Sequence, residues 1–371
     1  MKRISTIALT LMMGAVSVFA QGPWGRGPVE DPTGYKDTYK DYFTVGVAVN
    51  MRNVTDPDQI ALIKKNFNSI TAENDMKVVS LQPREGEWNW ENADKIANFC
   101  RENGIPLRGH TLCWHSQFAD WMFVDENGND VSKEVFYERL RTHIHTVVNR
   151  YKDIVYAWDV VNEAIIEDGS YRKTPFYEIL GEEFIPLAFQ YAHEADPDAE
   201  LYLNDYGMNN PGRRDTYVKI ANELKARGLR IDGIGMQSHV GMDYPDMQEY
   251  EESLLAFAGT GCNVMITEWD MSALPSINFG ANISDTVAFK ASLNPYPDGL
   301  PEDVDALWNS RMKELMDLYL KHSDKITRVT AWGVADGDSW KNDWPMDGRT
   351  DSPLLFDRNH QPKPFLNEYM K

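Results

Sequence analysis

The sequence predicts a single (β/α)₈ barrel, the α/β fold class in which eight parallel strands alternate with helices around one ring. Two observations lead to this fold. Short apolar segments alternate along the chain with longer segments whose apolar residues recur at helical spacing. Residues that break helices, such as Gly104, Pro197 and Gly228, stand where the helical segments end. With 371 residues, the chain is long enough for one such barrel with insertions.

The expected strands are the short apolar segments. They lie at Thr44–Val49, Ser69–Ala72, Pro106–Trp114, Val155–Val161, Glu200–Asn204, Gly233–Ser238, Val264–Glu268 and Val329–Val334. The helical segments lie near residues 56–66, 91–103, 132–150, 176–195, 212–227, 246–258 and 304–322, and a short one follows Pro364. An open doubly wound sheet is the alternative, but no GxGxxG segment follows the first strand.

Residues 1–20 have the pattern of a secretory signal peptide. Lys2 and Arg3 precede an apolar run from Ile7 to Phe19, and the small residue Ala20 follows it. The run is shorter than the ~20 residues that a membrane-spanning helix needs. We therefore expect a secreted or periplasmic protein with no membrane attachment after cleavage. Residues 21–40, rich in Gly, Pro and charge, are expected to form an N-terminal arm, and residues 41–371 the barrel domain.

Composition narrows the classes of partner. The chain is 42% hydrophobic and 25% charged, which is typical of a soluble globular protein, and we expect a monomer. Its net charge of −20 argues against nucleic acid, because phosphate binding requires a basic face. Cys100, Cys113 and Cys262 are too few for a disulfide scaffold. We expect buried free thiols, with one disulfide as the alternative.

The histidines do not predict a metal site. His143 and His145 form HIH, a spacing found in some metal-dependent hydrolase barrels. Here they lie inside a helical segment, where residues two apart do not share a face, so a solvated structural role is expected. The sequence also contains no C-x-x-C pair and no GxSxG segment. It therefore predicts neither a metal nor another cofactor.

Polar and aromatic residues concentrate where the expected strands end, which is the active face of a (β/α)₈ barrel. They are Glu73, Asn74 and Lys77; His110, Trp114 and His115; Asn162 and Glu163; Asn204, Asp205 and Tyr206; Gln237, Ser238 and His239; Glu268, Trp269 and Asp270; and Trp332, Trp340 and Trp344. We expect the functional site at this rim.

Glu163 is the first candidate for catalysis. It closes the apolar segment WDVVNE. A carboxyl group among Trp side chains with little water has a raised pKa, because its charged form is poorly solvated, and this suits a general acid. The alternative is a salt bridge at the end of the barrel.

Glu268 is the second candidate. In VMITEWD the strand alternation is expected to place Val264, Ile266, Glu268 and Asp270 on one face. His239 on the neighbouring strand could then bridge the two carboxylates, although a purely structural ion network is the alternative. Glu163 and Glu268 end strands three apart in a ring of eight, so they can face each other across the mouth. Two such carboxyl groups are the machinery of glycoside hydrolysis, and their separation decides whether the reaction retains or inverts configuration.

Aromatic residues at the rim favour a sugar ligand. Indole rings pack against the flat C–H faces of pyranoses, and Trp114, Trp332, Trp340 and Trp344 are the candidates. Trp88, Trp90 and Trp158 are expected in the core. The proline-rich segment Ser272–Pro301 is unusually long for a loop, and we expect it to cover part of the active face.

Together these segments resemble the family 10 glycoside hydrolases, the β-1,4-xylanases. The matching segments occur in the family's order and cover nearly all of residues 40–371. They are TAENDMK (71–77), GHTLCWHSQ (109–117), WDVVNEA (158–164), LNDYG (203–207), MQSH (236–239), ITEWD (266–270), WGVADGDSW (332–340), PLLFD (353–357) and PKP (362–364). The resemblance implies a retaining endo-β-1,4-xylanase that acts on xylan and xylo-oligosaccharides.

The resemblance also implies a role for each matching residue. Glu163 would be the acid/base and Glu268 the nucleophile. Glu73, Asn74 and Lys77 would hold the sugar two places from the cut on the non-reducing side. The sugar being attacked would be lined by His110, Trp114, Asn162, Gln237, Trp332 and Trp340. His239 would bind substrate and, with Asp270, orient and tune the nucleophile, and Tyr206 would lie near the cleavage point.

Three departures from the family pattern affect sugar binding rather than the chemistry. Trp269 stands where the family usually has an aliphatic residue, Val78 stands where a Trp often follows the lysine, and residues 272–301 form a longer segment than usual. A relative that cleaves cellulose or another β-glucan, or one that prefers xylo-oligosaccharides, is the alternative enzyme. A non-catalytic glycan-binding protein is the third hypothesis.

Overall fold

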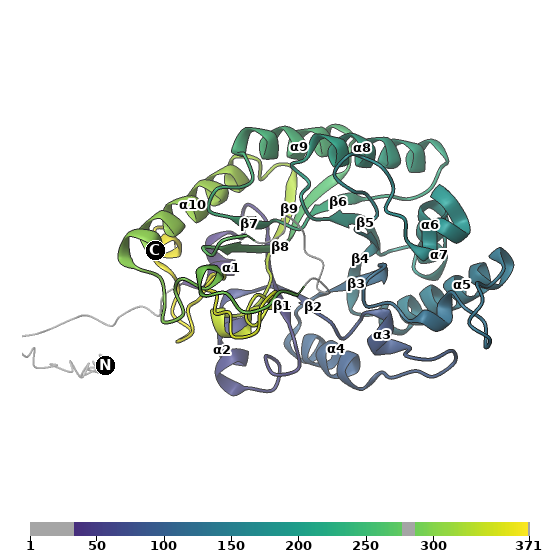
Figure 1. Cartoon of the computed structure of the whole chain (residues 1–371), viewed down its shortest axis with the longest axis horizontal. Helices are drawn as coiled ribbons and strands as arrows, with labels where there is room; N and C mark the ends of the chain where they lie inside the picture. The colour runs from purple at the N-terminus through teal and green to yellow at the C-terminus, as the bar shows by residue number, and fades with distance from the viewer. Residues whose placement is uncertain (1–32, 277–285, 370–371) are drawn as a thin grey trace, which may run out of the picture. The chain divides into compact units, whose positions relative to one another are not determined.

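The computed structural model describes residues 33–276 and 286–369, and eight of its parallel strands close into a ring (Figure 1). The strands are β1 (Thr44–Val49), β2 (Ser69–Ala72), β3 (Leu107–Cys113), β4 (Val155–Asn162), β5 (Glu200–Asp205), β6 (Gly233–Met236), β7 (His239–Gly241), β8 (Asn263–Ser272) and β9 (Ile326–Ala331). Neighbours in the ring follow chain order, β6 pairs with β8, and β9 pairs with β1. The predicted (β/α)₈ barrel is confirmed. The short β7 lies outside the ring, paired with the end of β8.

Helices surround the strands, and most of them cover the outside of the barrel (Figure 1). They are α1 (Tyr35–Thr38), α2 (Pro57–Asn66), α3 (Val78–Leu81), α4 (Glu91–Asn103), α5 (Lys133–Tyr151), α6 (Pro175–Leu180), α7 (Phe184–Ala195), α8 (Pro211–Ala226), α9 (Met247–Gly259), α10 (Glu302–Lys321) and α11 (Pro364–Asn367). The segment predicted as one helix at 176–195 is divided into α6 and α7, because Gly181 after α6 adopts a positive φ of 61°. No helix of the described residues is both long and apolar enough to cross a membrane.

Side-chain caps explain where several helices begin. Asp56 accepts hydrogen bonds from the Asp58 and Gln59 amides at 2.9 and 3.3 Å, and Pro57 occupies the first helical position of α2. Asn210 before α8 and Asp246 before α9 accept from the first-turn amides in the same way. These caps satisfy amide donors that the helix itself leaves unpaired.

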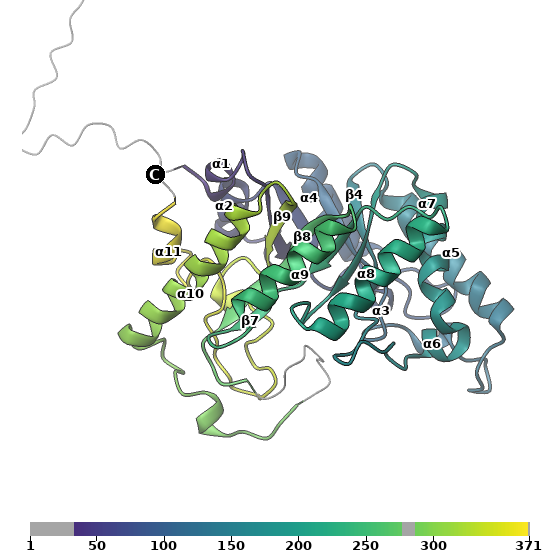
Figure 2. The same cartoon turned by 90° about the horizontal axis from the view of Figure 1, so that it is seen from above.

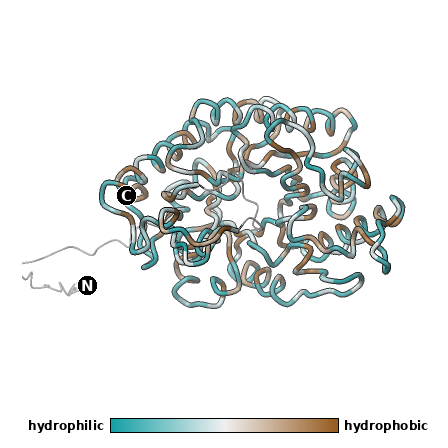
Figure 3. Tube along the Cα trace, in the orientation of Figure 1, coloured by the Kyte–Doolittle hydropathy of each residue, from teal (hydrophilic) through white to brown (hydrophobic). Residues whose placement is uncertain are grey.

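Hydrophobic packing holds the helices to the strands. Figure 3 shows the helices alternating between apolar and polar residues along their turns, as amphipathic helices on a barrel should. Trp308 of α10, Trp158 of β4 and Tyr319 of α10 are fully buried in or against this core. Burying one such side chain stabilises the fold by about 1.5–3 kcal/mol relative to leaving it in water. Cys100, Cys113 and Cys262 are buried free thiols, as expected without a disulfide.

The interior of the barrel contains charged side chains. Arg328 is 1% exposed and donates to Thr330 Oγ1 at 2.8 Å, to Thr71 Oγ1 at 3.0 Å, and to the Tyr156 hydroxyl. Arg108, fully buried, is paired with Asp159. A buried guanidinium is tolerated only where such partners replace water. The barrel is thus a packed, polar-lined core rather than a pore.

The strand alternation expected in β8 was only partly right. Val264 and Ile266 pack in the main core with helix residues, whereas Met265 belongs to a separate cluster of strand residues with Ala157 and Tyr202. The register of β8 against β9 shifts between Ile266 and Trp269. This irregularity lets Glu268 leave the face of Val264 and Ile266 and turn toward the barrel mouth.

The barrel domain begins earlier than residue 41. Tyr35 and Tyr39 are each 1% exposed, and the Tyr35 amide donates to Asn66 Oδ1 at 3.1 Å. The compact unit starts at Thr33, so the end of the expected arm packs with the barrel. Residues 1–32, which include the predicted signal peptide and the rest of the arm, lie outside the described residues.

A buried ion pair ties the C-terminal segment to the loop after β9. Lys363 Nζ lies 3.0 Å from Asp336 Oδ1, donates to the Ser352 carbonyl at 2.6 Å, and lies 4.0 Å from the ring centre of Trp308. Burial raises the pKa of Asp336 to about 6 against the opposing effect of Lys363. The loop held in this way carries Trp340 and Trp344.

We predict that Lys363→Ala lowers the free energy of unfolding by about 3–5 kcal/mol, because it leaves a carboxylate buried without its partner. Urea denaturation followed by tryptophan fluorescence measures the loss. Lys325→Ala, which removes a pair at the surface, is the control and should leave the unfolding midpoint near that of the wild type. Equal midpoints for the two variants would contradict a stabilising role for the buried pair.

Candidate active site

The loops that follow the strands gather on one side of the barrel, where α3, α6 and β7 lie (Figure 2). A cavity of about 260 Å³ opens among these strand ends. Its walls contain every predicted site residue except Tyr206 and Asp270: Glu73, Asn74, Lys77, His110, Trp114, Asn162, Glu163, Gln237, His239, Glu268, Trp332 and Trp340. Gln117, which the sequence analysis missed, and Trp344 complete the walls.

Glu163 projects into this cavity from a strained position directly after β4. Its φ of 58° lies in the left-handed region, which a non-glycine residue adopts only when its surroundings enforce it. The Glu163 amide donates to the Asn204 carbonyl at 2.9 Å, and the Arg172 Nε donates to the Glu163 carbonyl at 3.0 Å. Glu163 is 5% exposed, and its carboxyl group accepts a hydrogen bond from Gln237 Nε2 at 3.1 Å.

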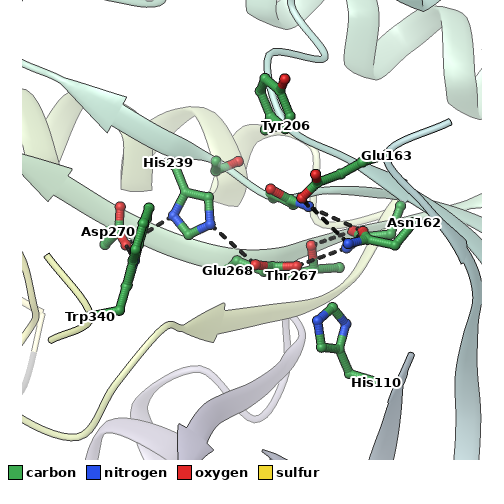
Figure 4. A network of polar contacts seen from close by, with 12 residues as sticks. His110, Asn162, Glu163, Tyr206, His239, Thr267, Glu268, Asp270 and Trp340 are labelled. Atoms are coloured by element: carbon green, nitrogen blue, oxygen red, sulfur yellow. Dashed lines mark hydrogen bonds and ion pairs between the residues drawn. The ribbon is translucent and has the colours of Figure 1, made fainter. Parts of the chain in front are cut away.

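Glu268, within β8, is held by charged and amide donors. His239 Nε2 lies 3.1 Å from Glu268 Oε2, and Asn204 Nδ2 donates to Oε1 at 2.8 Å (Figure 4). The orientation of Asn204 is fixed in turn by Thr267, whose hydroxyl donates to Asn204 Oδ1 at 2.6 Å. The sequence placed Asn204 at the rim but assigned no role in the site to Asn204 or Thr267; Asn204 is the residue before the last of β5.

A chain of amides connects the two glutamates. Asn204 Nδ2 also donates to Asn162 Oδ1 at 2.9 Å, and Gln237 Nε2 reaches both Asn162 Oδ1 and Glu163 Oε1 at 3.1 Å. Both carboxyl groups therefore face the same cavity, and their positions are coupled through shared hydrogen-bond partners (Figure 4).

The two environments move the carboxyl pKa values in opposite directions. Burial, reinforced by the charge of Asp205, raises the pKa of Glu163 to about 7. Burial also acts to raise the pKa of Glu268, but the hydrogen bond from His239 and the charges of His110 and His239 outweigh it and lower that pKa to about 2. At neutral pH one group is a carboxylate and the other is close to its titration midpoint. Such separation is how two like groups take different catalytic tasks.

His239 lies between two carboxylates (Figure 4). Its Nδ1 is 2.9 Å from Asp270 Oδ2, and Asp270 is fully buried. Burial alone would lower the pKa of His239, but Asp270 and Glu268 outweigh it and raise the pKa to about 9, so both ring nitrogens donate. Trp340 Nε1 donates to the same Asp270 oxygen at 2.8 Å, and Lys341 Nζ lies 3.5 Å from the other oxygen. Asp270 thus acts behind His239 and does not line the cavity.

Lys77 forms the opposite wall. Its ammonium donates to Asn74 Oδ1 at 2.8 Å and to Gln117 Oε1 at 2.6 Å, and lies 4.7 Å from the ring centre of Trp114. Burial lowers the pKa of Lys77 to about 8, although Glu73 opposes this shift. Burial raises the pKa of Glu73. This wall presents carboxylate, amide and ammonium groups beside an indole, a set that suits a hydroxylated ring.

Tyr206 lines a second cavity of about 290 Å³ that adjoins the first. The two cavities share His239, Trp340 and Trp344. The Tyr206 hydroxyl accepts from Arg172 at 3.0 Å, and the Arg213 guanidinium lies 4.2 Å from its ring centre. The space beside the two carboxyl groups therefore continues from the first cavity into the second.

Comparison with known proteins identifies the chain. The family model described as Glycosyl hydrolase family 10 matches residues 34–371. The chain belongs to glycosyl hydrolase family 10. It is 43% identical over 375 residues to endo-1,4-beta-xylanase A of Xylanibacter ruminicola, a match that covers 100% of this chain and 99% of the relative. It is 45% identical over 373 residues to an endo-1,4-beta-xylanase/feruloyl esterase of the same species, but covers only 49% of that protein.

Solved structures agree with the family assignment. A GH10 endoxylanase retrieved from sugarcane soil metagenome superposes with a TM-score of 0.87 at 44% identity, over 91% of this chain and 99% of the other. This family 10 chain is therefore a glycoside hydrolase with the (β/α)₈ barrel of its relatives.

Two sequence departures lie outside the site. Trp269 is fully buried on the outer side of the barrel, with its ring 5.3 Å from that of Tyr319 and 6.2 Å from that of Phe365. Val78 is 2% exposed in α3. Neither residue lines the 260 Å³ cavity. These two differences from the family pattern therefore alter the packing around the site and leave the walls of the cavity unchanged.

The described ends of the Ser272–Pro301 segment pack beside the active face; residues 277–285 lie outside the described residues. Leu274 and Ser276 line the second cavity. The Val287 amide donates to the Pro345 carbonyl at 2.8 Å, and Asn294 Nδ2 donates to the Gly348 carbonyl at 3.1 Å. The described residues of this segment thus support the loop that carries Trp344.

Trp158 is fully buried. Trp88 and Trp90 are partly buried against the core, and their two rings stack with their centres 4.6 Å apart. His143 is 1% exposed, 2.8 Å from Gln82 Oε1, whereas His145 is paired with Glu194 at 3.2 Å. The expected structural role fits both histidines, but His143 is buried rather than solvated. Among the described residues, no group of three or more His, Cys, Asp or Glu side chains is arranged to hold a metal ion.

We predict that His239→Asn raises the pKa of Glu268 from about 2 to its ordinary range near ~4 or above, because a charged donor is lost while burial remains. Carboxyl ¹³C NMR of glutamate-labelled protein measures the titration. His193→Asn, at an exposed position of α7, is the control and should leave it unchanged. A Glu268 pKa that stays near 2 in His239→Asn would assign its ionisation to Asn204 and His110 instead.

Proposed function

We propose that this family 10 enzyme is a retaining endo-β-1,4-xylanase acting on xylan and xylo-oligosaccharides, with Glu163 as acid/base and Glu268 as nucleophile. The observation that supports the roles is the pair of buried carboxyl groups with separated pKa values on one cavity. The substrate comes from the names of the relatives, which are xylanases.

In the first step, the Glu268 carboxylate attacks the anomeric carbon of the sugar in the 260 Å³ cavity. The bond from that carbon to the glycosidic oxygen breaks as Glu163 gives its proton to this oxygen, so the leaving chain departs as an alcohol. The His239 and Asn204 donors keep Glu268 ionised and aim its oxygens.

In the second step, Glu163 accepts a proton from water, which attacks the same carbon and releases Glu268. Two inversions at one carbon give net retention. A group that must donate and then accept a proton works best with a pKa near the working pH, and a value of about 7 for Glu163 meets that need.

The substrate chain would run through both cavities. Glu73, Asn74 and Lys77 would hold the sugar two places from the cut on the non-reducing side, and Trp114, Trp332 and Trp340 would pack against the sugar being attacked. Tyr206 would meet the leaving side in the 290 Å³ cavity. Binding space on both sides of the carboxyl groups supports cleavage within a chain rather than removal of terminal sugars.

We predict that Glu268→Gln lowers kcat/KM on xylan more than ~10³-fold, because it removes the nucleophile. We predict a loss of about 10²–10⁴-fold for Glu163→Gln. Reducing-sugar release from xylan, with products resolved by size, measures both. A 2,4-dinitrophenyl xylobioside separates the roles, since its leaving group needs no proton. Glu163→Gln should form the glycosyl-enzyme from it at nearly wild-type rate, with turnover restored by azide.

Glu102→Gln, an exposed glutamate of α4, is the matched control and should retain wild-type activity. Wild-type enzyme that releases sugar from carboxymethylcellulose but not from xylan would replace the substrate assignment and leave the carboxylate roles standing. Binding of xylan without release of reducing sugar would establish glycan capture instead.

We also propose that the enzyme is a secreted or periplasmic monomer, supported by the signal-peptide pattern of residues 1–20. Expression of the full chain in a secreting host should give a mature protein that begins at Gln21, which N-terminal mass spectrometry tests. Recovery of the activity inside the cell on a chain that retains residues 1–20 would contradict the proposal. Light scattering would report the oligomeric state.

A further inference from the structure

Asp205 is a buried carboxylate behind Glu163 that the mechanism above does not use. We propose that Asp205 is a positioning residue that favours the protonated form of Glu163 in the free enzyme, by placing a second negative charge near it while its hydrogen-bond partners fix the Glu163 backbone. The inference rests on the proposed role of Glu163 and concerns what sets its state.

Hydrogen bonds favour the ionised form of Asp205. It ends β5 and is fully buried. Oδ2 accepts from the Tyr217 hydroxyl at 2.6 Å, and Oδ1 accepts from the Tyr206 amide at 2.8 Å. Burial raises the pKa of Asp205 overall, but the Arg213 guanidinium, the Tyr217 hydroxyl and the Arg172 guanidinium act in the opposite direction and limit this rise.

Glu163 has weaker support for its charge. It accepts hydrogen bonds from the side-chain amides of Gln237 at 3.1 Å and Asn162 at 3.4 Å, and the Trp114 side chain also favours its charged form. The hydrogen bonds to Asp205 are shorter, at 2.6 and 2.8 Å, and the nearby charge of Arg213 further favours its ionised form. When two buried carboxyl groups interact, the better-supported one loses its proton first and the other keeps it to higher pH. Asp205 is therefore the anion of the pair, and Glu163 the acid.

The same partners hold the Glu163 backbone. Asn162 of β4 pairs with Asn204 of β5, so residues 163 and 205 leave neighbouring strands at the same level. The Tyr217 hydroxyl that donates to Asp205 also accepts from the Ala164 amide at 3.1 Å. Arg213 Nε donates to the Ile165 carbonyl at 3.0 Å. The turn in which Glu163 adopts its positive φ is thus built on the groups that surround Asp205.

Other charges near the pair act in known directions. Glu163 is influenced by Asp205 and Glu268, which favour its protonated form, and by Lys77 and Arg172, which favour its ionised form. After burial, Asp205 is the largest cause that raises the pKa of Glu163, ahead of Glu268. Removing the charge of Asp205 while keeping its shape should therefore let Glu163 ionise at lower pH.

The test is Asp205→Asn, with kcat/KM on xylohexaose measured against pH. For the wild type, activity should fall as pH rises through about 7, where Glu163 loses its proton. In the variant this fall in activity on the alkaline side, the basic limb of the pH profile, should occur about 0.5–1.5 pH units lower. The loss at neutral pH should be at least ~5-fold greater on xylohexaose than on the dinitrophenyl xylobioside, which needs no acid. A purely structural role would lower both rates alike and leave the limb in place.

Asp196→Asn is the matched control, a buried aspartate just before the other end of β5, and its basic limb should coincide with that of the wild type. A limb that stays at the wild-type pH in Asp205→Asn overturns the inference, whereas the acid role of Glu163 is judged separately by Glu163→Gln.

If Asp205→Asn does not fold, carboxyl ¹³C titration of the wild type decides the order of ionisation. Ionisation of Asp205 before Glu163 supports the inference, and the reverse order overturns it.

Discussion

The site depends on one constraint: a carboxylate removed from water stays charged only if donors in the protein replace the water. Glu268 meets this constraint through His239 and Asn204, and His239 in turn meets it through Asp270. Asp270 is supported by Trp340 and Lys341 from the loop after β9. A chain of hydrogen bonds and ion pairs thus runs from Glu268 in the cavity to the loop after β9, and each buried charge in it is stabilised by the next group.

Glu163 meets the same constraint in the opposite way. Burial outweighs its hydrogen-bond donors, so its pKa is raised, and the charge of Asp205 adds to this shift. The chain thereby obtains two chemically different groups from one residue type. The difference arises from what lies behind each side chain, since both face the same cavity.

Much of this could be predicted from the sequence because a parallel barrel brings all strand ends to one rim. Once the strands were placed, Glu163, Glu268, His239 and the tryptophans had to converge. The register shift in β8 could not be foreseen, because it depends on pairing with β9 rather than on local pattern. The positive φ of Glu163 and the contributions of Asn204 and Gln117 depend on contacts between distant segments, and no local signal reports those. The burial of Tyr35 and Tyr39 was hidden for a simpler reason, because a single short turn shows no helical periodicity.

Helix α1 and Tyr39 also decide where the barrel domain can be joined to other proteins. The ring centre of Tyr39 lies 6.1 Å from that of Tyr369, so the two ends of the barrel domain lie close together. A domain whose ends are adjacent can be inserted within a loop of another protein, or cut elsewhere and rejoined, without stretching its fold. The contact between Tyr39 and Tyr369 thus allows this domain to be joined to another protein at a single site.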